Sequence, residues 1–337
     1  MTIFTFPSDG IRWSSSTVKP EIFAELHVDC RNGLGEMPVW CPESGTLYWI
    51  DVVNPGRVFH WAGGTHKPDS CSFAHPVTGL NLAGAGNLLV HGETSLLLFH
   101  PETSRSHPIW TLPASPARMR FNDGHCDPVG RLWVGTMGNN FAEDGTAVAI
   151  TGNIGQIWAV TPEGGRPIDA GFGCPNAICW SPDGGIFYVA DSYNGWLYSY
   201  RFDLEAGNVT DRRPFCRLSG LGIPDGAAVD EDGYLWNARW GAGTVARIGP
   251  DGQLDRLVRL PVSQPTACCF GDRDRRTLYI TTARYALDPD RLLAEPLAGG
   301  IFAIRTGVPG LELPCFQPQP VGGKAWRPGG EARSAEY

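Results

Sequence analysis

Five polar side chains stand at equivalent places, just ahead of short apolar segments that recur along the chain. Glu36 lies in GLGEMPVW, Arg120 and Asn122 lie in RFNDG, Asn176 lies in CPNAICW, and Asp225 lies in IPDGAAVD. Taken singly, an Asn or Asp near a glycine is usually a turn residue, and Glu36 before a strand is usually a solvated strand end. Recurrence at one position of a repeat favours function, because a turn does not need a carboxylate or an amide each time. Side-chain oxygens without Cys or His indicate a hard divalent cation, Ca²⁺, Mg²⁺ or Mn²⁺ by preference, with Zn²⁺ and Fe²⁺ left open.

Other polar residues carry a weaker signal for chemistry. Asp51, Asp191 and Asp230 fall at or near predicted strand ends, where we expect them to anchor turns. His125 fits a packed imidazole and a solvent-facing one equally well. The chain has no GxSxG elbow of a serine hydrolase, no P-loop and no dinucleotide-binding fingerprint.

The elements that must position these residues come from a repeat of about 40–50 residues. Six units begin near Met37, Gly79, Asn122, Pro175, Pro224 and Pro265. Asp/Gly turns such as SPDGG and DEDGY separate short strands, and aromatic and β-branched residues recur at strand periodicity in TLYWID and IFYVAD. The sequence therefore predicts an all-β fold, a six-bladed β-propeller with four antiparallel strands per blade. The alternative, a pair of β-sandwiches, lacks such a repeat.

The sequence also predicts the structure of the chain ends, of one insertion and of a short helix. The segment Glu21–Val28 is predicted to be the outer strand of the last blade, which closes the ring and removes an open edge. Residues 1–20 and 311–337 are predicted tails around a propeller domain spanning 21–310. The insertion 138–152 is predicted to be a long loop, either a lid or disordered, and a short helix is expected near Asp288–Leu297.

Composition excludes several classes of protein. Of the 337 residues, 42% are hydrophobic and 18% are charged, which fits a large buried core. A net charge of −8 without a basic stripe argues against nucleic-acid binding, and no apolar run reaches the roughly 18 residues of a membrane span. The N-terminus lacks a basic start and an apolar stretch, so we expect a cytoplasmic protein. The ten cysteines include no CxxC pair and are expected to be reduced and structural.

Four motifs resemble, in order, those of the gluconolactonase and regucalcin (senescence marker protein) family of six-bladed propellers. They are GLGEMPVW at Gly33, RFNDGHCDPVGRLWVGTM at Arg120, PNAICWSPDGGIFYVADS at Pro175 and PDGAAVDEDGYLWNA at Pro224. The last blade also resembles bacterial sugar lactonases, through LYITTAR followed by PLAGGIFAI. The resemblance spans about Glu21–Arg305, nearly the whole chain.

The resemblance implies a metal site made by Glu36, Asn176 and Asp225, with Asp225 also acting as general base. It implies that Arg120 contacts a substrate hydroxyl and that Asn122 lies beside metal and substrate. The implied reaction is hydrolysis of a sugar lactone to the open aldonic acid. In it the metal polarises the carbonyl, and Asp225 takes a proton from the attacking water.

Two positions depart from the family pattern. Ala177 follows Asn176 where relatives usually carry glycine, and its methyl group is expected to narrow the channel or shift the backbone. Gly138-Asn139-Asn140 stands where many relatives place an acidic residue that contacts the sugar, so we expect Asn140 to supply that contact.

Two other functions stay open at this point. One is a related propeller esterase or phosphotriesterase, and the other is a non-enzymatic calcium-binding protein, since propellers often serve as interaction platforms. A polar channel containing Arg120 favours a sugar. The leading expectation is an aldonolactonase with a small-molecule substrate and with no nucleic-acid or membrane partner.

Overall fold

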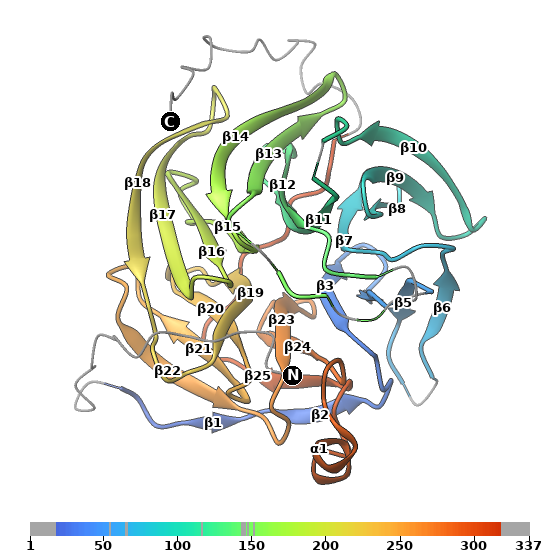
Figure 1. Ribbon diagram of the computed structural model, residues 1–337. Helices are drawn as coiled ribbons and strands as arrows, with labels where there is room; N and C mark the ends of the chain where they lie inside the picture. Colours follow the sequence, from blue (N-terminus) through green and yellow to red (C-terminus); the bar gives the residue numbers. More distant parts are fainter. Residues whose placement is uncertain are drawn as a thin grey trace.

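The protein is a ring of six blades around a central channel, each of four antiparallel strands, and one blade carries a fifth strand that pairs in parallel (Figure 1). The computed structural model describes residues 18–317 except 54, 65–66, 116, 143–145, 147 and 151. Each blade runs from an inner strand at the channel to an outer strand at the rim. This arrangement confirms the predicted six-bladed propeller.

The blades follow one another in chain order. Blade 1 contains β3 (Gly35–Cys41), β4 (Thr46–Asp51), β5 (Arg57–Trp61) and β6 (Asp69–Ser72). Blade 2 contains β7 (Gly79–Ala83), β8 (Asn87–His91), β9 (Ser95–His100) and β10 (Arg105–Thr111). Blade 3 contains β11 (Met119–Cys126), β12 (Leu132–Gly138), β13 (Gly155–Thr161) and β14 (Gly164–Phe172). Blade 4 contains β15 (Pro175–Trp180), β16 (Ile186–Asp191), β17 (Trp196–Asp203) and β18 (Asn208–Cys216). Blade 5 contains β19 (Ile223–Val229), β20 (Leu235–Trp240), β21 (Thr244–Ile248) and β22 (Leu254–Arg259). Blade 6 contains β23 (Pro265–Gly271), β24 (Thr277–Thr282), β25 (Ile301–Arg305) and β2 (Glu25–Val28).

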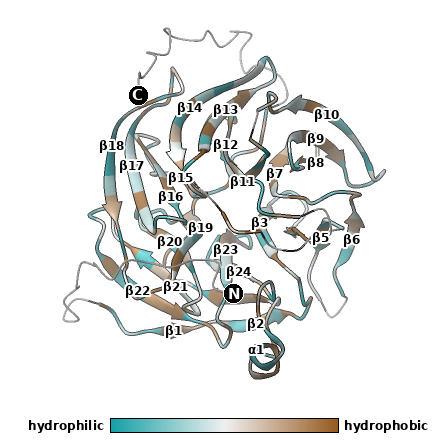
Figure 2. Cartoon of the chain, in the orientation of Figure 1, coloured by the Kyte–Doolittle hydropathy of each residue, from teal (hydrophilic) through white to brown (hydrophobic). Residues whose placement is uncertain are grey.

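The core lies between the faces of neighbouring blades. The inner strands β15, β19 and β23 are buried along their whole length, whereas the outer strand β18 is mostly exposed and hydrophilic (Figure 2). Aromatic rings fill the space between blades: Trp133 of blade 3 packs against Trp180 and Phe187 of blade 4, with ring centroids 5.9 and 5.1 Å apart. Burial of these large apolar faces holds the ring together.

Five of the six inner strands share a β-bulge at the same place. The pairing with the second strand shifts register between Glu36 and Val39, Phe121 and Gly124, Asn176 and Cys179, Pro224 and Ala227, and Pro265 and Cys268. Among the six inner strands, only β7 pairs with the second strand of its blade, β8, in regular register. A bulge bends its strand and turns a side chain away from the regular pleat. Five of the six predicted site residues, all except Asn140, therefore lie inside the inner strands, at or beside bulges, rather than ahead of the strands as the repeat suggested.

Two bulge residues adopt left-handed backbone conformations without being glycine. Met37 has φ of +47° and Ala177 has φ of +52°. The methyl group of Ala177 is fully buried in the apolar cluster between blades 4 and 5, and Ala177 does not line the channel cavity described below. The departure from glycine at this position therefore strains the backbone without narrowing the channel.

The N-terminal segment closes the ring in two steps. Strand β2 pairs antiparallel with β25, which confirms the predicted outer strand of the last blade. The residues before it form β1 (Ile22–Phe23), which pairs in parallel with β22 of blade 5. The segment Glu21–Val28, predicted as one strand, is thus divided between two blades. The division lies at Ala24, a buried residue whose backbone N–H donates to the carbonyl oxygen of Arg259 in blade 5.

The chain stays packed against the propeller after residue 310. The backbone N–H of Leu311 donates to Val229 of blade 5, and that of Phe316 donates to Leu82 of blade 2. Phe316 itself is buried. This segment crosses the channel at the end where the inner strands finish, over a cavity of about 280 Å³ that His125 also lines. Residues 311–317, the last that the structure describes, therefore pack against the blades.

Three smaller expectations have direct outcomes. The helix α1 (Pro289–Ala294) forms where a short helix was predicted, with the Asp288 side chain capping its N-terminus. All ten cysteines are free thiols, which agrees with reduced, structural cysteines. Among the described residues, no helix has the length and apolar character needed to cross a bilayer.

Replacing Ala177 by glycine tests the strain at this bulge. A non-glycine residue in the left-handed region costs about 1–2 kcal/mol, and Ala177→Gly removes that cost while it also removes a buried methyl group. Ala246, equally buried in β21 and outside the left-handed region, is the matched control. We expect Ala246→Gly to be the more destabilising by about 1–2 kcal/mol, measured by urea unfolding. Equal losses in the two variants would show that Ala177 is not strained.

Candidate active site

A cavity of about 110 Å³ opens at the end of the channel where the inner strands begin. Blades 1, 3, 4 and 5 and the loop after β12 each contribute polar side chains to its wall. All six site residues predicted from the sequence line this cavity: Glu36, Arg120, Asn122, Asn140, Asn176 and Asp225. The fold therefore brings together groups that lie up to 189 positions apart in the chain, from Glu36 to Asp225.

Backbone carbonyls fix the orientation of the two central amides. Ser192 Oγ donates to the carbonyl oxygen of Pro224 (2.6 Å), so its oxygen is left to accept from Asn176 Nδ2 (2.7 Å). Asn122 Nδ2 donates to the carbonyl oxygen of Pro175 (2.9 Å) and to Asn176 Oδ1 (3.0 Å). Since a carbonyl can only accept, neither amide can be reversed without losing a bond. Asn176 Oδ1 consequently keeps one lone pair for a further partner in the cavity.

Arg120 is buried and held by four hydrogen bonds. Its Nε and Nη2 donate to Asn140 Oδ1 at 2.9 and 2.7 Å, and its Nη1 donates to the Phe121 carbonyl and to Asn122 Oδ1 at 2.7 and 2.8 Å. The guanidinium lies over the ring of Phe141, 4.9 Å from its centroid. A guanidinium has five N–H donors, so one N–H of Arg120 remains for a ligand. The long insertion thus supplies Asn140 and Phe141 as the walls that hold this arginine.

The inner strands of blades 2 and 6 contribute no side chain to the cavity wall, but they brace their neighbours. Asn81 Nδ2 in blade 2 donates to the carbonyl oxygen of Gly124 (3.0 Å), just beyond the bulge of blade 3. His91 Nε2 hydrogen-bonds to Asn81 Oδ1 at 2.8 Å, and burial lowers the pKa of His91 to about 3, so its ring is neutral. Thr266 Oγ1 in blade 6 donates to the carbonyl oxygen of Gly35 (2.5 Å), directly before Glu36.

The two carboxylates of the cavity disfavour each other's ionisation. Burial raises the pKa of Glu36 well above its ordinary value, and the nearby charges of Asp225 and Asp123 raise it further. Burial and the charge of Asp123 likewise raise the pKa of Asp225 well above its ordinary value. Arg120 lowers the pKa of Glu36 and Arg239 lowers that of Asp225, yet both pKa values remain raised. The site therefore favours a bound positive charge.

The donor set fits a hard divalent cation. Glu36 and Asp225 offer carboxylate oxygens, and Asn176 offers the amide oxygen whose orientation is fixed, which are the ligand types that Ca²⁺, Mg²⁺ and Mn²⁺ prefer. Within the part of the chain that the structure describes, no three His, Cys, Asp or Glu side chains come together as a metal cluster. A cation here therefore depends on amide oxygens as well as on the two carboxylates.

Sequence reasoning missed the rest of the cavity wall. Six apolar or aromatic residues line it: Leu34, Met137, Ile150, Ile223, Trp240 and Tyr285. They lie in or beside the inner and second strands and in connecting segments, where no repeat marks them. Cys174 also lines the cavity, but burial raises the pKa of its thiol, so it is not a thiolate nucleophile. Ser192 had a usable signal, since it directly follows Asp191 at the end of a strand.

Of the three aspartates predicted to anchor turns, Asp191 and Asp230 each accept a backbone N–H from the turn that follows them, whereas Asp51 bonds to the segment ahead of its own inner strand. Asp51 and Asp191 each accept two backbone N–H groups, at 2.8–3.1 Å, from the segment that leads into the inner strand of their own blade. Asp230 accepts from the N–H of Tyr234 and from Nε1 of Trp236, both at 2.9 Å. These carboxylates hold the strands that carry the site and do not reach the cavity.

Fold and cavity together define a class: six-bladed propellers with an oxygen-rich, cation-compatible site at one end of the channel. Residues 34–284 match the profile of the SMP-30/gluconolactonase/LRE-like region. The chain belongs to this family, as the sequence motifs predicted.

Individual relatives agree over nearly the full length. Rabbit (Oryctolagus cuniculus) regucalcin is 34% identical over 303 residues, covering 88% of this chain and 97% of the relative. The 6-deoxy-6-sulfogluconolactonase of Pseudomonas putida is 34% identical over 286 residues, covering 84% and 94%. The crystal structure of regucalcin from Agrobacterium tumefaciens, described as a calcium-binding protein, superposes with a TM-score of 0.81 at 28% identity, covering 88% of this chain and 99% of that one.

The paired carboxylates predict a stability effect in protein stripped of divalent cations. Because the folded-state pKa of Asp225 is raised, its contribution to stability is lost as pH rises above the ordinary carboxyl range, so at pH 7 the ionised group is destabilising. Asp225→Asn removes this charge and should raise Tm by about 2–4 °C, the shift that roughly 1 kcal/mol produces in domains of about 150–250 residues. Differential scanning calorimetry in EDTA at pH 7 measures it.

The control for that experiment is Asp191→Asn. Asp191 is equally buried, but its carboxylate accepts backbone N–H groups, and an amide nitrogen facing those donors loses at least one bond. This variant should therefore lower Tm. A fall in Tm for Asp225→Asn as well would mean that Asp225 stabilises the metal-free fold and that the electrostatic argument is wrong.

Proposed function

We propose that this protein hydrolyses a sugar lactone (an aldonolactone) to the open aldonic acid, with the help of one divalent cation. The observation that carries the proposal is the channel cavity, which combines two buried carboxylates, an oriented amide oxygen and one available guanidinium N–H. The relationship to the 6-deoxy-6-sulfogluconolactonase of Pseudomonas putida supports the same reaction class.

Glu36, Asn176 and Asp225 are the residues that would hold the cation. When bound, it supplies Lewis-acid polarisation of the lactone carbonyl. The chain's contribution is to keep three oxygen donors in place before the cation arrives. Ser192 and Asn122 fix the amide of Asn176, and the three side chains line the cavity from positions at the bulges in β3, β15 and β19.

Asp225 is the group that we assign as general base. Its carboxylate lies in the cavity wall with a raised affinity for protons, because it is buried and faces Asp123. A water molecule beside it can pass a proton to the carboxylate as its oxygen attacks the carbonyl carbon of the lactone. The bond between the carbonyl carbon and the ring oxygen then breaks, and the ring oxygen takes up a proton to become a hydroxyl group of the aldonic acid.

Arg120 and Asn140 are the groups that we assign to the sugar. Arg120 has one N–H left for a substrate oxygen, and Asn140 uses its Oδ1 for Arg120, which turns its Nδ2 to a substrate hydroxyl. Asn122 spends both N–H groups on Pro175 and Asn176, so it positions Arg120 and Asn176 beside the substrate and accepts at most one bond from it. A lactone ring carrying hydroxyl groups meets donors on one side and the apolar wall on the other.

The central test measures hydrolysis of a panel of aldonolactones with a pH indicator. Protein stripped with EDTA should be inactive, and one or more of Ca²⁺, Mg²⁺, Mn²⁺, Zn²⁺ and Fe²⁺ should restore activity after spontaneous hydrolysis is subtracted. Asp225→Asn should lower kcat by about 10²–10⁴-fold, the usual contribution of a general base, while circular dichroism shows an intact fold.

Three outcomes would contradict parts of this proposal. Full activity of Asp225→Asn would show that Asp225 is not the general base. Activity that survives EDTA would show that the reaction does not need a cation. Cation-dependent stabilisation without hydrolysis of any lactone in the panel would indicate a non-enzymatic calcium-binding protein, the property that is described for the Agrobacterium relative.

Ser192→Ala tests the positioning of the amide ligand. Loss of Ser192 Oγ frees Asn176 Nδ2 and lets the amide rotate, and outer contacts of this kind change metal affinity or activity by about 10–100-fold. The apparent Kd of the activating cation, from the Tm shift against cation concentration, should rise by that factor. Ser181→Ala is the matched control, because Ser181 bonds to Asp183 and Ile186 at the opposite end of the same blade. Equal cation affinity in the two variants would show that Asn176 needs no support.

A further inference from the structure

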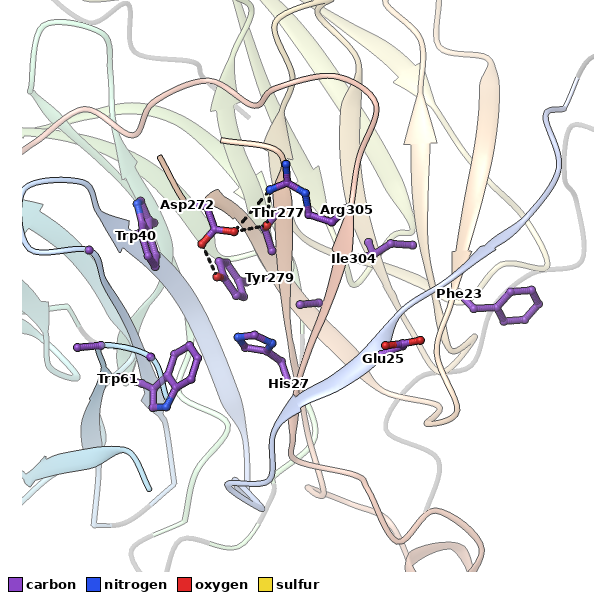
Figure 3. Close-up of a pocket in the computed structure, with 14 residues that line it drawn as sticks. Phe23, Glu25, His27, Trp40, Trp61, Asp272, Thr277, Tyr279, Ile304 and Arg305 are labelled. Atoms are coloured by element: carbon purple, nitrogen blue, oxygen red, sulfur yellow. Dashed lines mark hydrogen bonds and ion pairs between the residues drawn. The ribbon is translucent and has the colours of Figure 1, made fainter. Parts of the chain in front are cut away.

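A cavity of about 670 Å³ lies outside the channel, where the last blade meets the first (Figure 3). In its wall His27 packs edge-to-face against Trp61 and Tyr279, with ring centroids 4.8 and 5.3 Å apart. Tyr279 Oη donates to Asp272 Oδ1 at 2.9 Å, and Asp272 lies 3.6 Å from the guanidinium of Arg305. These contacts hold the seam between the two blades together, and none of the described residues in this wall also lines the channel cavity.

A buried arginine in blade 5 lies much nearer to the chemistry of the channel. Arg239 of β20 occupies the same place in its blade as Asp51 in β4 and Asp191 in β16, because each pairs with the residue directly before a site residue of the inner strand. Asp51 and Asp191 accept backbone N–H groups from the segment that enters their inner strand. Arg239 instead donates to backbone carbonyls. Blade 5 thus reverses the charge of this anchor in the blade that carries Asp225.

Arg239 holds the connection that leads from β18 into β19. Its Nε donates to the carbonyl oxygen of Leu221 at 2.8 Å, and its Nη2 donates to those of Leu218 and Gly222 at 3.3 and 2.9 Å. Only 1% of Arg239 is exposed, so the protein and not bulk water satisfies its N–H groups. Ile223, which directly follows this connection, lines the channel cavity. The arginine therefore fixes the point at which the chain enters the wall of the site.

Asn237 links Arg239 to the backbone of Asp225. Arg239 Nη1 donates to Asn237 Oδ1 at 3.0 Å, and Asn237 Nδ2 donates to the carbonyl oxygens of Asp225 and Gly226 at 2.6 and 3.3 Å. Asn237 is fully buried, and a carbonyl can only accept, so its amide cannot be reversed without losing these bonds. Asp225 and Gly226 lie at the bulge of β19, where the regular ladder is interrupted. The amide thus holds the backbone of the bulge from which Asp225 reaches the cavity wall.

This pair of residues is particular to the blade that carries the assigned general base. Two residues before the anchor position, blades 1 and 4 have Trp49 and Val189, which are fully buried apolar side chains. Packing between blades therefore does not require a polar pair here. Burial lowers the pKa of Arg239 to about 10, and the charge of Asp225 opposes that change, so the guanidinium stays protonated at neutral pH.

We propose that Asn237 and Arg239 are positioning residues for the reaction: they hold the β19 bulge and thereby keep the Asp225 carboxylate at its place in the cavity wall. Neither side chain lines the cavity, so both act through the backbone of Asp225 and not on the substrate. The inference rests on the proposed function, through lactone hydrolysis for its effect on kcat and through the cation site for its effect on cation affinity.

The experiment compares Asn237→Ala, Arg239→Lys and the double variant, using the aldonolactone and the cation that give wild-type protein its highest rate. Each single change should lower kcat and raise the apparent Kd of the cation by about 10–100-fold, the range that outer contacts of a metal site produce. KM for the lactone should change little at saturating cation. The double variant should lose no more than the more damaging single change, because residues that act as one unit are not additive.

Arg247→Lys is the matched control. Arg247 is a buried arginine of the same blade, but its guanidinium bonds to Asp230 and Asp255 and does not reach the channel wall. This variant should lower Tm, as Arg239→Lys does, and leave kcat and the cation Kd unchanged. All variants are assayed well below their own Tm, so folded protein is compared throughout.

Unchanged kcat and cation affinity in Asn237→Ala and Arg239→Lys would overturn the proposal, and so would equal losses of both quantities in Arg247→Lys. Failure of the proposed reaction has a different signature, because wild-type protein then hydrolyses no lactone of the panel. In that case the Tm shift produced by Ca²⁺, Mg²⁺ or Mn²⁺ decides whether the two residues position a cation site. Wild-type protein that neither hydrolyses a lactone nor binds a cation would overturn both proposals.

Discussion

Hydrogen bonds that run around the channel, from a side chain of one blade to the backbone of the next blade's inner strand, are the constraint on which the site depends. In each, a side chain donates to a carbonyl at or beside the bulge of the neighbouring inner strand. They are Asn81 to Gly124, Asn122 to Pro175, Ser192 to Pro224, and Thr266 to Gly35. Packing between blade faces sets the distance between blades, but it tolerates sliding. A buried carbonyl that loses its donor costs more than the bond contributes, so these contacts fix the blades in register along the channel axis.

That register allows the protein to hold an unfavourable charge arrangement. Glu36 and Asp225 come from blades 1 and 5, and both have raised pKa values because they are buried close to Asp123. A looser channel would let water in or let the carboxylates move apart. Rigid strands keep the two carboxylates close together, and their electrostatic repulsion favours binding of a cation between them. Stability lost at a site in this way is a common condition for function.

The two ends of the chain remove the weak points that a ring of blades leaves open. Strand β2 covers the edge of the last blade, which removes a row of unpaired backbone groups. The segment that ends at Phe316 crosses the far end of the channel and ties blades 5 and 2 together. The channel therefore opens toward the Glu36 and Asp225 end, and the seam between blades 6 and 1 acquires the aromatic cavity that contains His27 and Trp61.

The sequence by itself determined the fold and six polar residues of the candidate site. Turn residues and strand periodicity repeat six times, because every blade packs against its neighbours in the same way. The same repeat marks Glu36, Asn176 and Asp225 at equivalent positions. Only the tertiary structure decided how these residues are held. The bulges and the left-handed backbone at Ala177 arise from pairing with the second strand. The clamp of Asn140 on Arg120 brings an insertion back over the channel. Such contacts join segments that are far apart in the sequence, and they do not recur from blade to blade. Local sequence patterns therefore do not predict them.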